Sequence, residues 1–283
     1  MQGTLRSGFA WLMVGMLALA ACGPAPSVAP AANEPAGDAP AATSERCGDP
    51  SQLSDSVSFY NWGDYIDPDV LTQFEEECGV EVIYDTFSSN EDLLAKLQGG
   101  AAGYDLIVPS DYMVAIMIQL GLLKELDHAN IPNLALISKN LSDQPYDPGN
   151  KYSVPFMWGV AGIGYDADEV ATPPTSLAAL FDPAQAEQYA GKISLLNDSR
   201  ETIGAALKYL GYSMNSTDPA QLEEAKQVLL AVKEYVLTFD SDTYSDLVVS
   251  GETVMAHGWN GGFAIAIAQN PDRNFGFVIP EEG

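Results

Sequence analysis

The stretch from Val154 to Asp166 is V-P-F-M-W-G-V-A-G-I-G-Y-D, which is apolar and rich in glycine. Its glycines do not follow the G-x-G-x-x-G spacing, which argues against a dinucleotide-binding turn. On each side of it lies a block in which strand-like and helix-like patterns alternate. We therefore interpret the stretch as an extended segment that crosses between two lobes, predicted to occupy residues 55–158 and 159–283.

Three apolar runs predict strands in the first block: Val57–Tyr60, Val80–Tyr84 and Asp105–Pro109. Asp67 followed by Pro68 is typical of a helix start, and Gly79 ends that helix. Asn90 is predicted to cap a second helix, and a third helix is predicted from Met113 to Leu123. The order β-α-β-α-β predicts an α/β lobe, with a mostly parallel sheet flanked by helices.

The second block repeats this alternation. Strands are predicted at Ile193–Leu196 and Thr253–His257. Helices are predicted at Glu201–Leu210, from Asp218 through an apolar stripe that reaches Val236, and at Ser241–Ser250. The second lobe is therefore also predicted to be a mostly parallel sheet flanked by helices.

The charge of the chain is strongly acidic. Its 283 residues include 39 acidic and 12 basic side chains, for a formal net charge of −27. Nucleic acid is excluded as a partner, because binding to its backbone needs clustered Lys and Arg. The acidity suits a cationic ligand, but composition alone favours the simpler interpretation of a solvated acidic surface.

The N-terminus is predicted to be a targeting segment. Phe9 to Ala21 is apolar but too short for an ordinary membrane-spanning helix. It ends in L-A-A-C, and small residues before a cysteine resemble a bacterial lipobox. We predict a signal peptide over residues 1–21 and a lipid on Cys22, the alternative being a plain secretory signal.

Residues 22–54 are rich in Ala and Pro and predict a mobile linker that holds the folded part away from a membrane. Cys47 lies just before the first predicted strand, and Cys78 lies at the end of the first predicted helix. Two thiols of an exported chain can form a disulfide. The sequence leaves open whether these two do so, because it does not give their separation.

A candidate ligand site follows from the positions of the strand ends, because ligands of open α/β sheets bind beyond the carboxyl ends of the strands. The residues found there are Trp62, Asp64, Tyr65, Ser110, Asp111, Tyr112, Asp198, Glu201 and Trp259. Carboxylates pair with ammonium groups, and aromatic faces hold both methylenes and positive charge. This combination of residue types matches the chemistry of a polyamine.

Each of these residues also has a structural interpretation. Asp198 and Glu201 fit a helix-capping pattern, and Ser110 can cap the helix that follows it. Trp62 and Trp259 taken singly fit a hydrophobic core. It is their joint position at strand ends that favours a binding site.

Five motifs carry a resemblance to a known family. They are Y-N-W-G-D-Y-I (60–66), Y-D-L-I-V-P-S-D-Y (104–112), V-P-F-M-W-G-V-A-G-I-G-Y (154–165), N-D-S-R-E (197–201) and W-N-G-G (259–262). In the same order, they resemble the spermidine/putrescine-binding proteins of bacterial ABC uptake systems. The resemblance covers about Val57 to Gly283 and implies a two-lobe type II periplasmic solute-binding fold that closes over its ligand.

The resemblance also implies roles for residues of the first lobe. Trp62, Asp64 and Tyr65 would line one wall of the cleft. Ser110 and Tyr112 would contact the ligand from the same lobe.

In the second lobe, the resemblance implies that Asp198 and Glu201 hold an ammonium group and that Trp259 stacks on the methylene chain. Asp111, in the first lobe, remains a candidate from its position at a strand end, and the resemblance gives it less support because the family does not require an acid there. The sequence ends at Phe277–Gly283, where family members continue into a W-x-D segment and a return crossing. We therefore expect the C-terminal return segment to be missing, either from a fragment or from a protein that lacks part of the site.

The implied function is that of a monomeric, lipid-anchored receptor in the periplasm or on the outer face of the cell membrane. It would bind putrescine or spermidine and deliver it to an ABC permease. Two alternatives share the fold: a receptor for another small solute, and a sensory partner of a membrane receptor.

An enzyme is not expected. His128 and His257 lie in no H-E-x-x-H motif, and no Cys/His cluster has zinc spacing. Ser110 lacks a G-x-S-x-G setting, and no Walker motif is present. We predict neither a metal site nor a cofactor.

Overall fold

The computed structural model describes residues 46–63, 65–100 and 103–283. The predicted signal peptide, the lipid site at Cys22 and the candidate ligand residue Asp64 lie outside the described residues. Within the described ranges, no helix is long and apolar enough to cross a membrane.

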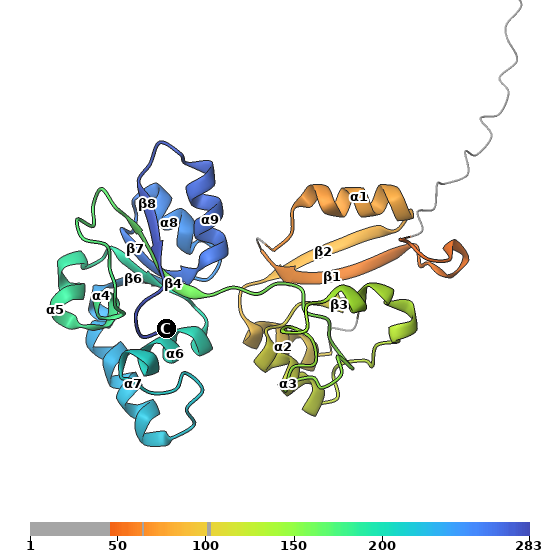
Figure 1. Cartoon of the computed structure of the whole chain (residues 1–283), viewed down its shortest axis with the longest axis horizontal. Helices are drawn as coiled ribbons and strands as arrows, with labels where there is room; N and C mark the ends of the chain where they lie inside the picture. The colour runs from red at the N-terminus through yellow and green to blue at the C-terminus, as the bar shows by residue number, and fades with distance from the viewer. Residues whose placement is uncertain (1–45, 64, 101–102) are drawn as a thin grey trace, which may run out of the picture. The chain divides into compact units, whose positions relative to one another are not determined.

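The first lobe is built on a three-stranded sheet with the order β2-β1-β3. Its strands are β1 (Ser56–Trp62), β2 (Glu81–Phe87) and β3 (Leu106–Ile107). Both neighbours of β1 run parallel to it, as predicted. The helices are α1 (Pro68–Cys78), α2 (Asn90–Gln98) and α3 (Asp111–Gln119). Figure 1 shows α1 on one side of this sheet and α2 and α3 on the other.

The second lobe contains a five-stranded sheet with the order β6-β5-β7-β4-β8. Its strands are β4 (Ala161–Asp166), β5 (Ile193–Leu195), β6 (Val236–Phe239), β7 (Met255–Trp259) and β8 (Phe275–Val278). β5 runs parallel to β6 and β7, whereas β4 runs antiparallel to β7 and β8. The other four strands therefore share one direction, and the predicted mostly parallel sheet is correct except at β4.

Helices surround this second sheet (Figure 1). They are α4 (Ala178–Phe181), α5 (Pro183–Ala186), α6 (Ser199–Tyr209), α7 (Pro219–Val232), α8 (Tyr244–Ser250) and α9 (Asn260–Gln269). Short 3₁₀ turns complete the described chain at η1 (Pro50–Gln52), η2 (His128–Asn130), η3 (Pro132–Leu136), η4 (Glu187–Tyr189) and η5 (Lys233–Tyr235).

The helix boundaries follow local capping chemistry. The Asp67 carboxylate accepts a hydrogen bond from the backbone N–H of Asp69 at 3.0 Å, and Gly79 ends α1 in the left-handed conformation with φ 68°. Ser89, rather than the predicted Asn90, caps α2 through the N–H of Asp92. Asn90 is fully buried and hydrogen bonds elsewhere, so the cap falls to the residue before it.

Several predicted elements were too long; the helix predicted at Ser241–Ser250, for example, begins only at Tyr244. The helix predicted to reach Val236 ends at Val232, and Val236 instead begins β6, because it pairs with Ile193 of β5. The strand predicted at residues 105–109 is reduced to Leu106–Ile107. The stretch beginning at Val154 becomes a strand only at Ala161. β8 was not predicted at all.

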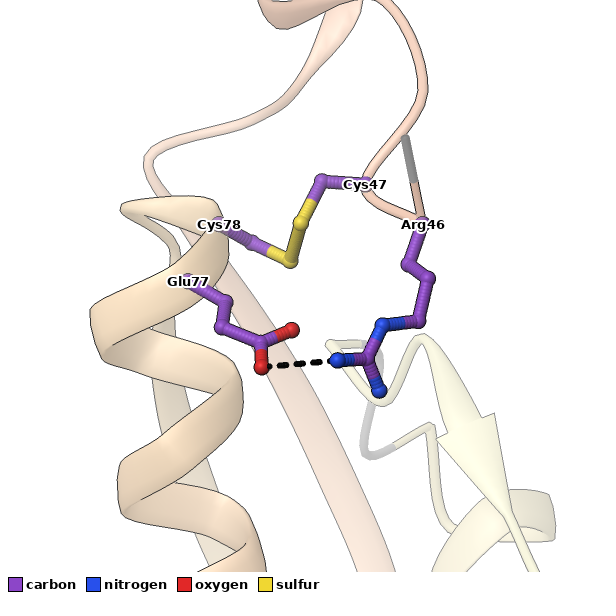
Figure 2. Close-up of a disulfide and its surroundings, with 4 residues drawn as sticks. All are labelled: Arg46, Cys47, Glu77 and Cys78. Atoms are coloured by element: carbon purple, nitrogen blue, oxygen red, sulfur yellow. Dashed lines mark hydrogen bonds and ion pairs between the residues drawn. A yellow bond between two sulfur atoms is a disulfide. The ribbon is translucent and has the colours of Figure 1, made fainter. Parts of the chain in front are cut away.

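A disulfide joins Cys47 to Cys78, with 5.4 Å between their Cα atoms. It connects the segment before β1 to the last residue of α1, so the pairing that the sequence left open is formed. The Arg46 guanidinium donates to the Glu77 carboxylate at 3.0 Å beside it (Figure 2). The two contacts together attach the start of the described chain to the C-terminal end of α1.

We expect Gly164→Ala to destabilise the second lobe. A Cβ atom at this β4 position would lie 2.0 Å from the ring of Phe263, which is itself buried. Overpacking of this kind costs about 2 kcal/mol of unfolding free energy. Urea unfolding followed by circular dichroism would measure the loss. Gly261→Ala is the control, because its Cβ would meet no atom within 4 Å; equal stability of both variants would contradict the packing argument.

Candidate functional site

Two tryptophans end strands of different sheets and lie near one another. Trp62 is the last residue of β1, Trp259 is the last residue of β7, and their ring centroids are 6.1 Å apart. The ring centroid of Tyr65 lies 5.9 Å from that of Trp62. The Trp62 indole N–H donates to the Val108 carbonyl at 2.9 Å, and its side chain belongs to a buried cluster. Trp62 thus has the predicted core role, and the hydrogen bond fixes its ring beside Trp259.

The start of α3 is held by a buried amide. The Asn90 side chain accepts from the Ser110 N–H at 2.9 Å and donates to the Ser110 hydroxyl at 3.0 Å. The Tyr112 hydroxyl donates to the Glu91 carboxylate at 3.2 Å. Burial, followed by the charges of Asp198 and Glu91, raises the pKa of Tyr112. Asn90 therefore positions Ser110, and Glu91 holds the hydroxyl of Tyr112. The sequence indicated neither role.

The start of α6 carries two carboxylates. Asp198 is only 3% exposed and accepts from the backbone N–H groups of Arg200 at 2.9 Å and Glu201 at 3.0 Å. The capping interpretation of Asp198 is therefore correct. Burial is the main cause that raises its pKa, and the two backbone hydrogen bonds oppose the change.

Glu201 is the most perturbed carboxylate at this helix start. Burial, followed by the charge of Asp198, raises the pKa of Glu201 to about 7, while a hydrogen bond from the Trp259 side chain opposes the change. The pKa of Tyr65 is raised by burial and by the charges of Glu201 and Asp198. Both carboxylates therefore act on the charge of Tyr65, and Trp259 donates a hydrogen bond to one of them, Glu201.

A pocket of about 310 Å³ lies at the starts of α3 and α6. Its lining residues are Ser110, Asp111, Tyr112, Tyr146, Arg200, Glu201, Met214 and Asn215. The structure thus brings together four predicted residues in the lining of one pocket: Ser110, Asp111, Tyr112 and Glu201. The other described candidates, Trp62, Tyr65, Asp198 and Trp259, are connected to it through the contacts given above.

Four residues that line the pocket were not predicted from the sequence: Tyr146, Arg200, Met214 and Asn215. Arg200 stands inside the N-D-S-R-E motif, and this could have signalled it. Tyr146 comes from an irregular loop, where the buried carboxylate of Asp147 accepts from the N–H groups of Tyr152 at 3.0 Å and Ser153 at 2.7 Å. Nothing in the sequence pattern placed this loop at the pocket.

A second hollow, of about 390 Å³, lies beside the tryptophan pair. It is lined by Gly63, Thr86, Phe87, Ser88, Asp242, Thr243 and Asp246. Phe87 lies 4.5 Å from Trp62, measured between ring centroids. In the part of the chain that the structure describes, no group of three or more His, Cys, Asp or Glu side chains could hold a metal ion.

Comparisons with known proteins identify the family of the chain. Residues 69–283 match the model of the family described as bacterial extracellular solute-binding protein. The chain is 36% identical over 237 residues to the putrescine/cadaverine-binding protein of Pseudomonas aeruginosa, covering 81% of this chain and 67% of that one. It is 38% identical over 233 residues to spermidine/putrescine-binding periplasmic protein 1 of Haemophilus influenzae, covering 81% and 63%.

Among solved structures, the Tp0655 (TpPotD) lipoprotein of Treponema pallidum has a TM-score of 0.71 and 35% identity, covering 81% of this chain and 71% of that one. The chain spans about two thirds of the length of the curated relatives it matches. Its two-lobe α/β architecture is the type II periplasmic binding fold of its structural relatives. The chain therefore belongs to the bacterial extracellular solute-binding protein family.

Proposed function

We propose that the protein captures a polyamine, putrescine or spermidine, outside the membrane and delivers it to an ABC permease. The observation that carries this proposal is the pocket bordered by Asp111 and Glu201 beside the Trp62–Trp259 pair. It combines carboxylates with aromatic faces at one place. The relatives reported above are named for binding putrescine, cadaverine or spermidine, which supports the same ligand class.

The ammonium groups and the methylenes of the ligand would be held by different side chains. An ammonium group would pair with Glu201 and Asp111, with Asp198 adding negative charge from behind. The methylenes would lie against Trp62 and Trp259, since indole faces accept both alkyl chains and positive charge. Tyr65, Ser110 and Tyr112 would complete the wall of the first lobe, and Asp64 stays part of the proposed site.

We also propose that Cys22 carries a lipid that holds the protein at the membrane through the linker of residues 22–54. The L-A-A-C sequence supports this, as does the similarity to a solved lipoprotein of Treponema pallidum. We propose that the protein acts as a monomer, with the permease and its ATPase as separate subunits. Membership of a family of solute-binding proteins supports the prediction that the chain is not an enzyme.

Titration calorimetry tests the ligand class. The purified protein would be titrated with putrescine, cadaverine, spermidine and a panel of neutral sugars. Micromolar or tighter binding of the amines, with no heat from the sugars, is the expected result. Sugar binding with silent amines, in protein that is folded by circular dichroism, would reject the polyamine and favour a receptor for another solute.

Polyamine affinity is expected to rise with pH up to about 7. The pKa of Glu201 is raised to about 7, so below that pH the carboxyl is protonated and must release a proton before it pairs with an ammonium group. Affinity should therefore increase by up to about tenfold per pH unit below the pKa and level off above it. Alkyl ammonium groups stay charged throughout this range.

Calorimetry in two buffers of different ionisation enthalpy would measure the released proton at each pH. Glu201→Gln is the control for this dependence, because it removes the titrating group and keeps the side-chain length. A slope that is unchanged in this variant would show that another group is responsible.

A further inference from the structure

Arg200 is a cation in the wall of a pocket proposed to hold cations, and the proposed function does not use it. It is the second residue of α6, and its backbone N–H donates to Asp198. The carbon of its guanidinium lies 5.1 Å from the centroid of the Tyr112 ring. A guanidinium in this position is attracted by the ring face, so the charge is held at the pocket wall.

The charges at the start of α6 nearly cancel. Asp198 and Glu201 each contribute one negative charge when ionised, and Arg200 contributes one positive charge that it cannot lose. The N-terminal end of the helix adds about half a positive charge. About half a negative charge is left, and Asp111 adds one more from the opposite wall. Glu91 adds a further negative charge near Tyr112, from whose hydroxyl it accepts a hydrogen bond. The attraction for a second ammonium group is therefore weakest beside Arg200, the only positive side chain among the residues that line the pocket.

The pocket has room for more than one ammonium group. Its volume of about 310 Å³ is larger than a single ammonium group needs, and Tyr146 and Asn215 line it as well as Glu201. A triamine with one ammonium at Glu201 could place its extra aminopropyl group in this space. The terminal ammonium of that group would then lie beside Arg200.

We propose that Arg200 is a specificity-determining residue that limits the positive charge the pocket accepts, and that it selects diamines over triamines. This inference rests on the proposed function. It concerns charge and not size, so a ligand with the length of a triamine but without the third charge should escape the discrimination.

The test compares three amines by titration calorimetry: putrescine, spermidine and N-butylputrescine, which has the spermidine skeleton with a methyl in place of the terminal ammonium. Arg200→Gln removes the charge. It should raise the affinity for spermidine relative to putrescine by about fivefold, as expected for removal of one nearby like charge. The ratio of the affinity for N-butylputrescine to the affinity for putrescine should stay unchanged.

Two further variants separate charge from structure. Arg200→Lys keeps the positive charge and should retain the wild-type ratios. Lys233→Ala removes an exposed positive charge away from the pocket and should change no ratio.

Two results would overturn the inference. If Arg200→Gln changed the affinity for all three amines by the same factor, Arg200 would be a structural contact of the pocket wall. If the wild type bound none of the amines, the proposed function would fail and the charge limit with it.

Discussion

Replacing both Cys47 and Cys78 by serine is expected to lower the unfolding free energy by about 3.5 kcal/mol. The disulfide closes a loop between residues separated by 31 positions, and the entropy that such a loop removes from the unfolded chain corresponds to this value. In urea unfolding, the variant should have a lower midpoint concentration. Before the transition, its circular dichroism should be close to that of the wild type.

The neighbouring ion pair provides the control for this prediction. Glu77→Gln breaks the contact with Arg46, whose side chain is 78% exposed, and surface pairs of this kind contribute less than about 1 kcal/mol. A double serine variant as stable as Glu77→Gln would show that the start of the described chain contributes little to the first lobe.

Asp198→Asn is expected to weaken polyamine binding about 100-fold, which corresponds to about 2.7 kcal/mol. The charge at the start of α6 explains the size of the effect. Without the Asp198 carboxylate, Arg200 and the helix terminus outweigh Glu201, so an attractive end of the site becomes a repulsive one. The helix itself should be preserved, because asparagine caps helices as well as aspartate does.

Asp218→Asn is the matched control for Asp198→Asn. Asp218 caps α7 in the same way, accepting from the N–H of Ala220 at 2.8 Å, and it does not line the pocket. Calorimetry should therefore find the wild-type affinity in this variant.

Trp259→Ala should also weaken binding, by tenfold or more, since it removes an aromatic face. Unchanged affinity in both Asp198→Asn and Trp259→Ala, with folding intact, would reject the proposed site.

Features that depend on neighbouring residues could be predicted from the sequence. Asp67 before Pro68 and Asp218 before Pro219 begin helices in the structure as predicted, because an N-cap needs only its own side chain and the next backbone N–H groups. Asp198 belongs to the same class. Its cap was predictable as an alternative to a ligand role, and the structure makes the two compatible.

Features that depend on distant residues could not be predicted. Val236 fits the apolar stripe of a helix, and only its pairing with Ile193 makes it part of a strand. Tyr146 reaches the pocket from a loop organised by the buried carboxylate of Asp147. Such positions are set by tertiary contacts that override local preference, and a single sequence does not reveal them.

The reversed strand β4 has a consequence for the order in which the protein folds. Ile163 of β4 pairs with His257 and with Val278, which lie far along the chain. During synthesis from the N-terminus, β4 therefore waits without its partners until β7 and β8 have emerged. Contacts between such distant residues carry a large loop-closure cost and slow folding. The first sheet, whose three strands lie close together in the chain, can form before β4 has found its partners.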